Sequence, residues 1–214
     1  MSSSVQAVDN RRLVVPYITR WSGEREPAVT VVERRGGGIG YARESLLDRD
    51  ELGVLWSRYS SSPGRGRPEF GKVHPMRQRR AMSRLLCQVC GGPADRDADG
   101  GVLWLWKDHR DHWSDWPEGM WSTEPPVCVP CVGQAVRLCP ALRHGAVAMR
   151  VRQFPIVGVY GLCHRPGPVP SGVANIGYDS PFIGWVQADH LIRQLSDCTL
   201  IELDELAGVS PCPS

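Results

Sequence analysis

Residues 85–116 read LLCQVCGGPADRDADGGVLWLWKDHRDHWSDW, and residues 125–131 read PPVCVPC. Each stretch contains one C-x-x-C pair, and 37 residues lie between the two pairs. Two intervening residues let both sulfur atoms of a pair point to one centre, so two pairs supply the four thiolates of a tetrahedral zinc site. Metal binding of this kind stabilises the surrounding fold. The sequence therefore predicts a structural zinc site formed by Cys87, Cys90, Cys128 and Cys131.

The residues around the second pair also predict local structure. VGQAVRLC, which follows Cys131, is compatible with a helix. Cys128 and Cys131 are then expected at a helix N-terminus, where the helix dipole favours thiolates. The remaining cysteines have no paired spacing and are expected to be buried or stray thiols; they are Cys139, Cys163, Cys198 and Cys212.

The cellular setting is predicted from what the chain lacks. The N-terminal MSSSVQAVDNRRLVVPYITR has no apolar signal core, because Arg11 and Arg12 occupy the place of one. No stretch approaches the roughly 18 apolar residues that a membrane-spanning helix needs. We expect a cytoplasmic protein with no membrane partner, in which cysteines bind metal more readily than they form disulfides.

Pattern and composition predict the elements on either side of the zinc site. LVVPYITRW and AVTVVERR are rich in β-branched residues and predict strands, and RRGGGIGYARE predicts a glycine-rich hairpin. PMRQRRAMSRLL predicts a basic helix over residues 75–86, with Pro75 at its first position. AVAMRVRQF and IVGVYGLC predict two strands separated by Pro155, and the near-helical spacing of apolar residues in PFIGWVQADHLIRQLSDC predicts a helix.

These elements predict an α+β fold with a central zinc-bound unit between a β-rich N-terminal segment and a C-terminal β-hairpin with a packing helix. The expected segments are a disordered tip 1–10, a β-rich segment 11–60, a basic linker and helix 61–84, the zinc unit 85–140, the C-terminal hairpin and helix 141–206, and a tail 207–214.

The zinc unit resembles the HNH endonuclease family, whose fold is a ββα-metal, treble-clef-like unit. In zinc-bearing members, a C-x-x-C is followed by a strand that ends in Asp-His, then by an Asn-containing loop, a second C-x-x-C and a helix. Here LWLWKDH supplies the strand and the Asp-His pair, and 19 residues lead from His109 to Cys128. WSTEPPVC occupies the place of the loop, and the resemblance covers about 55 of the 214 residues.

The resemblance implies roles for particular residues. Asp108 matches the metal-coordinating acid and His109 the general base, and a second divalent metal such as magnesium would serve catalysis. Two family positions are lost, because Thr123 stands in place of the loop Asn and Val132 in place of a metal ligand. Two neighbouring side chains, Asp111 and His112, can substitute for the lost groups. Of these, His112 is counted with Asp108 and His109 as a candidate catalytic residue.

Tryptophans and basic residues surround this unit. Five tryptophans fall within 18 residues, at positions 104, 106, 113, 116 and 121, and we expect most to fill a thin core while one or two offer a stacking surface. Residues 58–84 contain eight Lys or Arg against one acid, and residues 95–124 contain eight acids against three bases. The basic arm can contact phosphates or pair internally with the acidic segment. Its candidate nucleic-acid contacts are Arg65, Arg67, Lys72, Arg77, Arg79, Arg80 and Arg84.

Three functions follow from these features. The leading hypothesis is a zinc-stabilised nucleic-acid-binding or regulatory protein built on a degenerate, catalytically silent HNH-like unit. The second is a metal-dependent HNH-type DNA endonuclease with a rearranged site at Asp108, His109 and His112. The third is an adaptor that binds a protein or peptide partner through its tryptophan-rich face.

Overall fold

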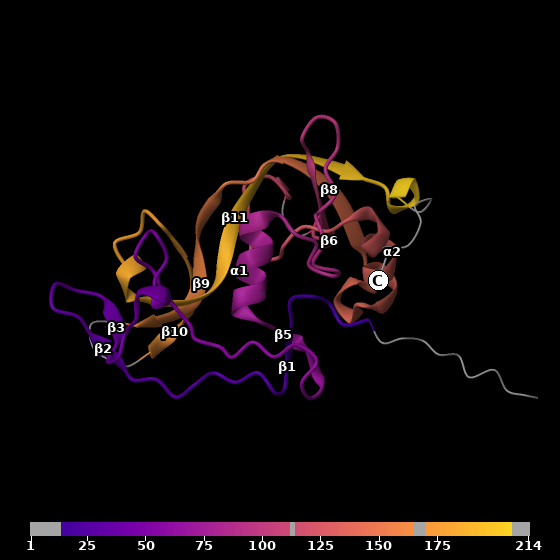
Figure 1. Ribbon diagram of the computed structural model, residues 1–214. Coiled ribbons are helices and arrows are strands. Elements are labelled where there is room, and N and C mark those ends of the chain that lie inside the picture. The colour runs from indigo at the N-terminus through magenta and orange to yellow at the C-terminus, as the bar shows by residue number, and fades with distance from the viewer. Residues whose placement is uncertain (1–13, 112–113, 165–169, 207–214) are drawn as a thin grey trace, which may run out of the picture.

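The computed structural model describes residues 14–111, 114–164 and 170–206. Within these ranges the chain is a mixed α+β protein in which strands predominate and two α-helices, α1 (Pro75–Arg84) and α2 (Val129–Leu138), lie beside the sheet (Figure 1). The expected tip 1–10 and tail 207–214 lie outside the described residues.

A seven-stranded sheet is built around one long strand, β11 (Val186–Ile201), of 16 residues. Two strands pair antiparallel with it in succession, because Arg193 faces Ile156 and Ser196 faces Gln153. These are β8 (Ala146–Gln153) and β9 (Ile156–His164), which confirm the two strands predicted on either side of Pro155. The sheet is completed by β10 (Pro170–Gly177) beside β9, by β6 (Val102–Lys107) beside β8, and by β4 (Leu55–Trp56) and β7 (Met120–Ser122) beside β11.

The predicted C-terminal helix is wrong, because its residues form most of β11. Two irregularities shift the register of β11 against β9, one between Ala188 and His190 and one between Ile192 and Arg193. The first adds Asp189 to β11 and changes which face the following side chains of β11 point to, whereas the second adds Val157 to β9. The buried side chains therefore do not alternate strictly, and their spacing imitates that of a helix. The predicted hairpin of the two strands around Pro155 is also wrong, because β11 lies between β8 and β9 and pairs with both. Strand β9 instead pairs antiparallel with β10, which the sequence did not predict.

Helix α1 forms where the sequence predicts a basic helix. Pro75 lies in its first turn, and the helix ends at Leu85, whose left-handed backbone (φ 51°) lets its N–H donate to the Ala81 carbonyl. One face packs on the sheet through Gln78, whose amide nitrogen donates to the Leu191 carbonyl at 2.9 Å and whose amide oxygen accepts from the Leu191 N–H at 3.0 Å. The prediction of a helix feeding directly into the first cysteine pair is confirmed.

Arg193 of β11 holds the last turn of the same helix. Its buried guanidinium donates to the Met82 carbonyl at 2.8 and 3.0 Å and also bonds to the Phe154 carbonyl. A cationic donor at the C-terminal end of a helix satisfies a carbonyl that has no intrahelical partner and complements the helix dipole. Helix α1 is therefore fixed to the sheet by polar bonds at both its middle and its end.

The N-terminal segment contains short strands. β1 (Thr19–Trp21) pairs with β5 (Pro68–Val73), and β2 (Val31–Glu33) pairs with β3 (Ile39–Tyr41). The predicted hairpin is confirmed in β2 and β3, whose connecting turn has glycines with positive φ at residues 36–38. Short 3₁₀ turns in the described residues are η1 (Leu46–Asp48), η2 (Pro140–Leu142), η3 (Ile183–Trp185) and η4 (Leu203–Leu206).

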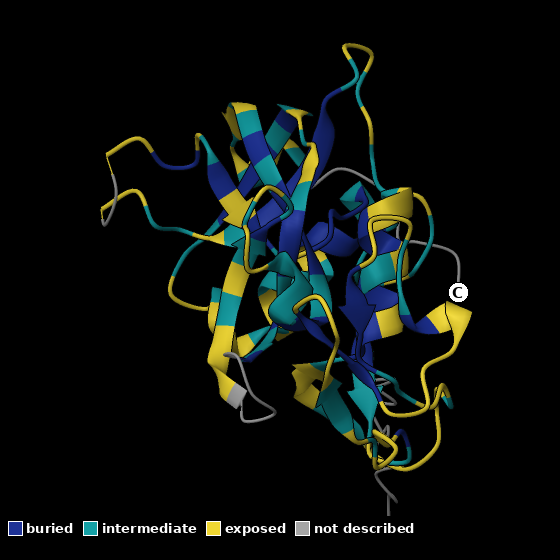
Figure 2. Cartoon of the chain, turned by 90° about the vertical axis from the view of Figure 1, so that its left-hand side faces the viewer, coloured by how far each residue is buried: buried dark blue, intermediate teal, exposed yellow. Residues whose placement is uncertain are grey.

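The core lies on both faces of the sheet, as the buried residues of Figure 2 show. Strand β6 illustrates this, because its first four residues are each at most 3% exposed. Leu103 and Leu105 pack with the cysteines and with α2, whereas Val102 and Trp104 pack with residues of β8 on the other side. This strand therefore carries the cysteine-containing end of the molecule on one face and the central core on the other.

Candidate metal centre and its surroundings

The first cysteine pair lies in a tight turn directly after α1. The Cys87 N–H donates to the Gly92 carbonyl at 2.7 Å, and the Gly91 N–H donates to the Cys87 carbonyl at 2.8 Å. Gly91 has a φ of +75°, and a Cβ at this position would lie 2.8 Å from the ring of Tyr17. A side chain there would be strained and would also collide with that ring, so the turn requires glycine.

The second pair lies at the start of α2, as the sequence predicts. Cys128 precedes the first helical residue, and the Cys131 N–H donates to its carbonyl at 3.0 Å. The residues just before it are fixed to the first pair by a bond from the Gln88 N–H to the Pro126 carbonyl at 2.9 Å, and to β6 by a bond from the Val127 N–H to the Leu103 carbonyl at 2.9 Å. These backbone bonds bring the two C-x-x-C pairs together.

The four cysteine sulfurs converge. The sulfur atoms of Cys87, Cys90, Cys128 and Cys131 all lie within 4.8 Å of one another. The Cys90 and Cys128 sulfurs are 3.7 Å apart, which matches the edge of about 3.8 Å expected for a tetrahedron with metal–sulfur bonds of about 2.3 Å. Because sulfur donors in this arrangement suit a soft or borderline divalent ion, the four residues fit a metal ion such as zinc.

The electrostatics of the cluster also favour a cation. Burial, together with the nearby sulfur of Cys87, raises the pKa of the Cys128 thiol to about 12, and burial and the same neighbour raise the pKa of Cys131. Without a cation, Cys128 and Cys131 are therefore held as neutral thiols. A divalent ion reverses this balance, because it binds the thiolate and offsets the cost of burying its charge.

An apolar core surrounds three of the four ligands. Cys87, Cys128 and Cys131 are buried, whereas Cys90 is exposed. The buried neighbours come from β6, β8 and α2 and include Leu103, Leu105, Val127, Val132 and Ala148. The cluster therefore joins α2 to the sheet in addition to closing the loop between the two cysteine pairs.

The Asp-His segment after β6 has a different arrangement. The Asp108 N–H donates to the Gly145 carbonyl at 3.2 Å, and the Asp108 carboxylate pairs with Arg110 at 2.6 Å. The guanidinium and backbone N–H of Arg110 lower the pKa of Asp108 to about 2. The ring of His109 meets that of Trp116 edge-on, with centroids 6.3 Å apart. Asp111 is exposed, and His112 lies outside the described residues.

Among the described residues, the four cysteines are the one group of three or more Cys, His, Asp or Glu side chains close enough to share an ion. Asp108, His109 and Asp111 form no such group. Thr123 contributes its carbonyl to Gln78, which donates at 2.6 Å, and Val132 is buried in the core beside the cysteines. The two positions where the family pattern departs therefore have structural contacts.

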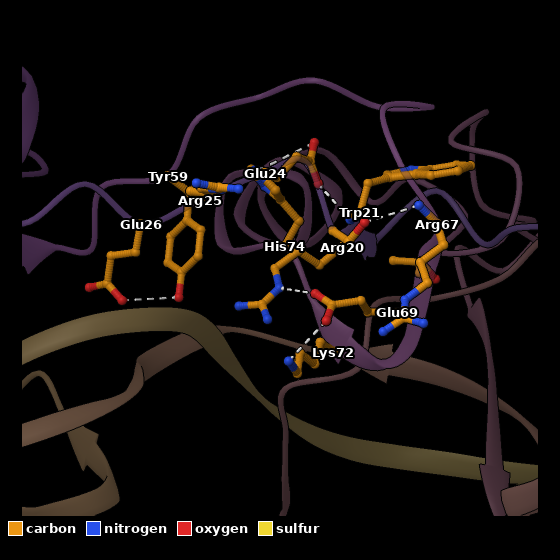
Figure 3. A network of polar contacts seen from close by, with 12 residues as sticks. Arg20, Trp21, Glu24, Arg25, Glu26, Tyr59, Arg67, Glu69, Lys72 and His74 are labelled. Carbon is orange, nitrogen blue, oxygen red and sulfur yellow. Dashed lines mark hydrogen bonds and ion pairs between the residues drawn. The ribbon is translucent and has the colours of Figure 1, made fainter.

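The predicted basic residues fall into distinct environments. Arg77 is buried and forms two bonds of 2.7 Å with Glu24, so its charge is already paired inside the protein. Lys72 bonds to Glu69, which also accepts from Arg20 (Figure 3). Arg79 stacks on Trp56 at 4.2 Å. The remaining four are exposed and form no ion pair within the described ranges; they are Arg65, Arg67, Arg80 and Arg84.

Internal pairing between the basic arm and the acidic segment is not observed in the described residues. Ion pairs of the arm go instead to acids at positions 24, 48 and 69. In the acidic segment, Asp95 and Asp97 pair with Arg150 of β8, and Asp108 pairs with Arg110. The exposed arginines of the arm are therefore not neutralised by residues 95–124.

Sequence reasoning missed the ion pair between Glu24 and Arg77. The Glu24 carboxylate also accepts from the backbone N–H groups of Trp21 and Ser62, each at 2.9 Å, and lies 3.8 Å from His74. Burial raises the pKa of Glu24, but Arg77 and the two backbone donors outweigh it and lower the pKa to about 2. The partners are 53 residues apart, and no local pattern marks them.

The tryptophans are mostly internal, and Trp113 lies outside the described residues. Trp104 is 0% and Trp116 is 7% exposed, Trp106 is half-buried, and Trp121 is 39% exposed. The cysteines outside the cluster lie at intermediate depth at positions 139, 163 and 198, and Cys212 is not described.

Comparison with protein-family models, with characterised proteins and with solved structures gives no match to this chain. In the described residues, none of the helices has the length and apolar character needed to cross a bilayer.

Proposed function

We propose that the protein is a zinc-stabilised nucleic-acid-binding protein whose 85–140 unit is a degenerate, catalytically silent relative of the HNH fold. The observation that carries this proposal is the position of α1. Its inner face is fixed to the sheet, its outer face carries Arg80 and Arg84, and its C-terminal end lies two residues from Cys87. A rigid helix with two outward, unneutralised arginines on one face is suited to contact phosphates.

The chemistry of the cluster supports zinc as the bound ion. Four sulfur donors with one edge of 3.7 Å suit a closed tetrahedral site, in which every coordination position is filled by protein. Such a site has no open position for a substrate or water. Zinc here would therefore serve to hold α2, β6 and the end of α1 together.

The order of elements supports a relation to the treble clef. A cysteine turn, β6, β7, and a helix that begins at the second cysteine pair follow one another along the chain. Yet β6 pairs with β8 and β7 with β11, so in the described residues the two strands do not form a hairpin of their own. We infer that the 85–140 unit keeps the cysteine core of the family, while its strands β6 and β7 are part of a larger sheet.

The surroundings of Asp108 support a silent unit. Its carboxylate is bonded to Arg110, and in the described residues it belongs to no group of three or more Cys, His, Asp or Glu side chains that could share an ion. Thr123 and Val132 replace the family's Asn and metal ligand. Contacts through exposed arginines need none of these groups, because backbone phosphates are bound by charge alone.

The test is binding of a short fluorescent DNA duplex and of a matching single-stranded RNA, measured by polarisation over a range of salt concentrations. The slope of log affinity against log salt should fall by about two when both Arg80 and Arg84 are changed to Ala, because each phosphate contact contributes about 0.9 to that slope. The matched control is Arg35→Ala, in the β2–β3 turn, which should leave the slope unchanged.

Two further measurements complete the test. Metal analysis of the reduced protein should give one zinc per chain, and plasmid incubated with magnesium or manganese should stay uncut. Absence of any binding to DNA or RNA at low salt would reject the nucleic-acid proposal. Plasmid cutting that is lost in His109→Ala would instead establish the nuclease hypothesis.

A further inference from the structure

The four cysteines differ in how accessible they are to small molecules. Cys90 is exposed, whereas the other three are buried under the apolar core that lines the cluster. A small oxidant therefore reaches one sulfur of the cluster before the others. Reaction at cysteine follows thiolate character and exposure, and metal binding keeps the sulfur in the thiolate form.

The sulfur of Cys128 lies close enough to that of Cys90 to act as its disulfide partner. Cys128 Sγ lies 3.7 Å from Cys90 Sγ, and a disulfide needs about 2.05 Å. The two sulfur atoms must therefore move closer by the difference of these two values, which is less than 2 Å. Cys90 lies in the turn before Gly91 and Gly92, whereas Cys128 is fixed at the start of α2. The shift can thus be made by the turn without moving the helix.

We propose that Cys90 and Cys128 form an oxidation site that reacts with peroxides and closes to a disulfide. The Cys90 thiolate attacks one oxygen of the peroxide, which breaks the O–O bond and gives a sulfenic acid and one hydroxide. The Cys128 thiolate then attacks the Cys90 sulfur, forms the S–S bond and displaces a second hydroxide. Two thiolates lose two electrons in total, and the peroxide gains both.

This inference rests on the proposed function, because it takes the four thiolates to be a zinc site. After oxidation, Cys87 and Cys131 remain as two ligands and cannot retain the ion in a tetrahedral site. Core packing around β6 and α2 then loses the ion that joins its parts. Since α1 ends two residues before Cys87, oxidation should also weaken the nucleic-acid contacts of Arg80 and Arg84.

The experiment treats the zinc-loaded full chain with hydrogen peroxide in the presence of a chromophoric zinc indicator, followed by peptide mapping without reduction. We expect one zinc to be released per chain, a disulfide between Cys90 and Cys128, and recovery of the zinc-bound form after dithiothreitol and zinc are added. Cys139→Ser and Cys198→Ser remove cysteines outside the cluster and should behave as the unchanged protein does.

A second variant separates the exposed sulfur from the metal site. Cys90→His keeps a zinc ligand in a three-cysteine, one-histidine set, which is a common structural site. It should release zinc at least about tenfold more slowly under peroxide. Mapping that finds a different disulfide, or zinc that is retained at full peroxide conversion, would overturn the inference. Absence of zinc before peroxide is added would instead reject the zinc proposal on which it rests.

Discussion

Two parts of residues 85–131 hold groups suited to metals, and they differ in how those groups are placed. The cysteines come from two turns that backbone hydrogen bonds hold together, and their sulfurs lie within 4.8 Å of one another. Asp108 and His109 are half-buried and lie in a single loop, where Asp108 bonds to Arg110 of the same loop. The difference teaches that convergence of separate segments, more than the types of residue present, makes a metal site.

The largest effect expected from this comparison is on the cysteine side. Cys128→Ser, or treatment with a strong chelator, should unfold residues 85–140, because structural zinc contributes binding energy of about 10 kcal/mol in small zinc-binding units. Urea titration and hydrogen exchange of the amides in β6 and α2 measure this loss. Cys139→Ser serves as the control and should leave the transition nearly unchanged. Retention of amide protection in the chelated protein would contradict the prediction.

The buried ion pair of Glu24 and Arg77 sharpens the comparison, because it brings together two distant segments without a metal. Its loss measures how much such a contact between charged side chains stabilises the fold. Glu24→Gln should lower the free energy of unfolding by about 3–5 kcal/mol, since it leaves the buried Arg77 without its counter-charge. Glu69→Gln removes a surface carboxylate and should cost much less. Urea denaturation measures the free energy of unfolding of both variants. Equal losses would show that the buried pair of Glu24 stabilises the fold no more than the surface pair of Glu69 does.

The same pair predicts a pH dependence. The pKa of Glu24 is about 2 in the folded protein, below the ordinary value of 4.5, so its stabilisation is fully present above about pH 4.5 and is lost as pH falls towards 2. The shift corresponds to about 3 kcal/mol. Unfolding free energies measured between pH 5 and pH 2 should fall less steeply in Glu24→Gln than in the unchanged protein. A parallel decline in both would exclude Glu24 as the source.

The smallest effect is expected on the Asp108 side. Asp108→Asn removes the ion pair with Arg110, which is exposed and formed within one loop. Zinc content should stay at one per chain, and the urea midpoint should not move measurably. Metal analysis and denaturation check both statements. Loss of zinc in this variant would break the contrast between the two regions, because Asp108 would then contribute to the site.

Local patterns predicted the elements that depend on local chemistry. The spacing of the cysteines predicted a cluster, Pro75 and the following helix formers predicted α1, and Pro155 predicted the break between β8 and β9. The helix and the strand break are marked by residues within a few positions of one another, and the cluster by one short cysteine spacing that occurs twice. The order of these elements also predicted a mixed α+β chain, and the assignment of the unit to the treble clef remains a prediction.

Other features depend on partners that are distant in the sequence. The buried side chains of β11 are spaced like those of a helix because an extra residue, Asp189, interrupts its pairing with β9. Such a pairing shift cannot be predicted from one segment alone. The bond of Arg77 to Glu24 spans 53 residues, so the sequence placed Arg77 among the candidate phosphate contacts. Long-range pairing thus accounts for the strand that was predicted as a helix and for the buried ion pair of Arg77.

The central place of β11 has a consequence for how the chain is made. Four other strands, β4, β7, β8 and β9, depend on it for backbone partners, and all four are synthesised before it. During translation, the strand edges that pair with β11 stay unpaired until residues 186–201 leave the ribosome. The two cysteine pairs are complete at Cys131, which is synthesised some 55 residues before Val186, so they can meet earlier. Metal capture would then precede closure of the sheet, and the cysteine end could become ordered before the seven-stranded sheet is complete.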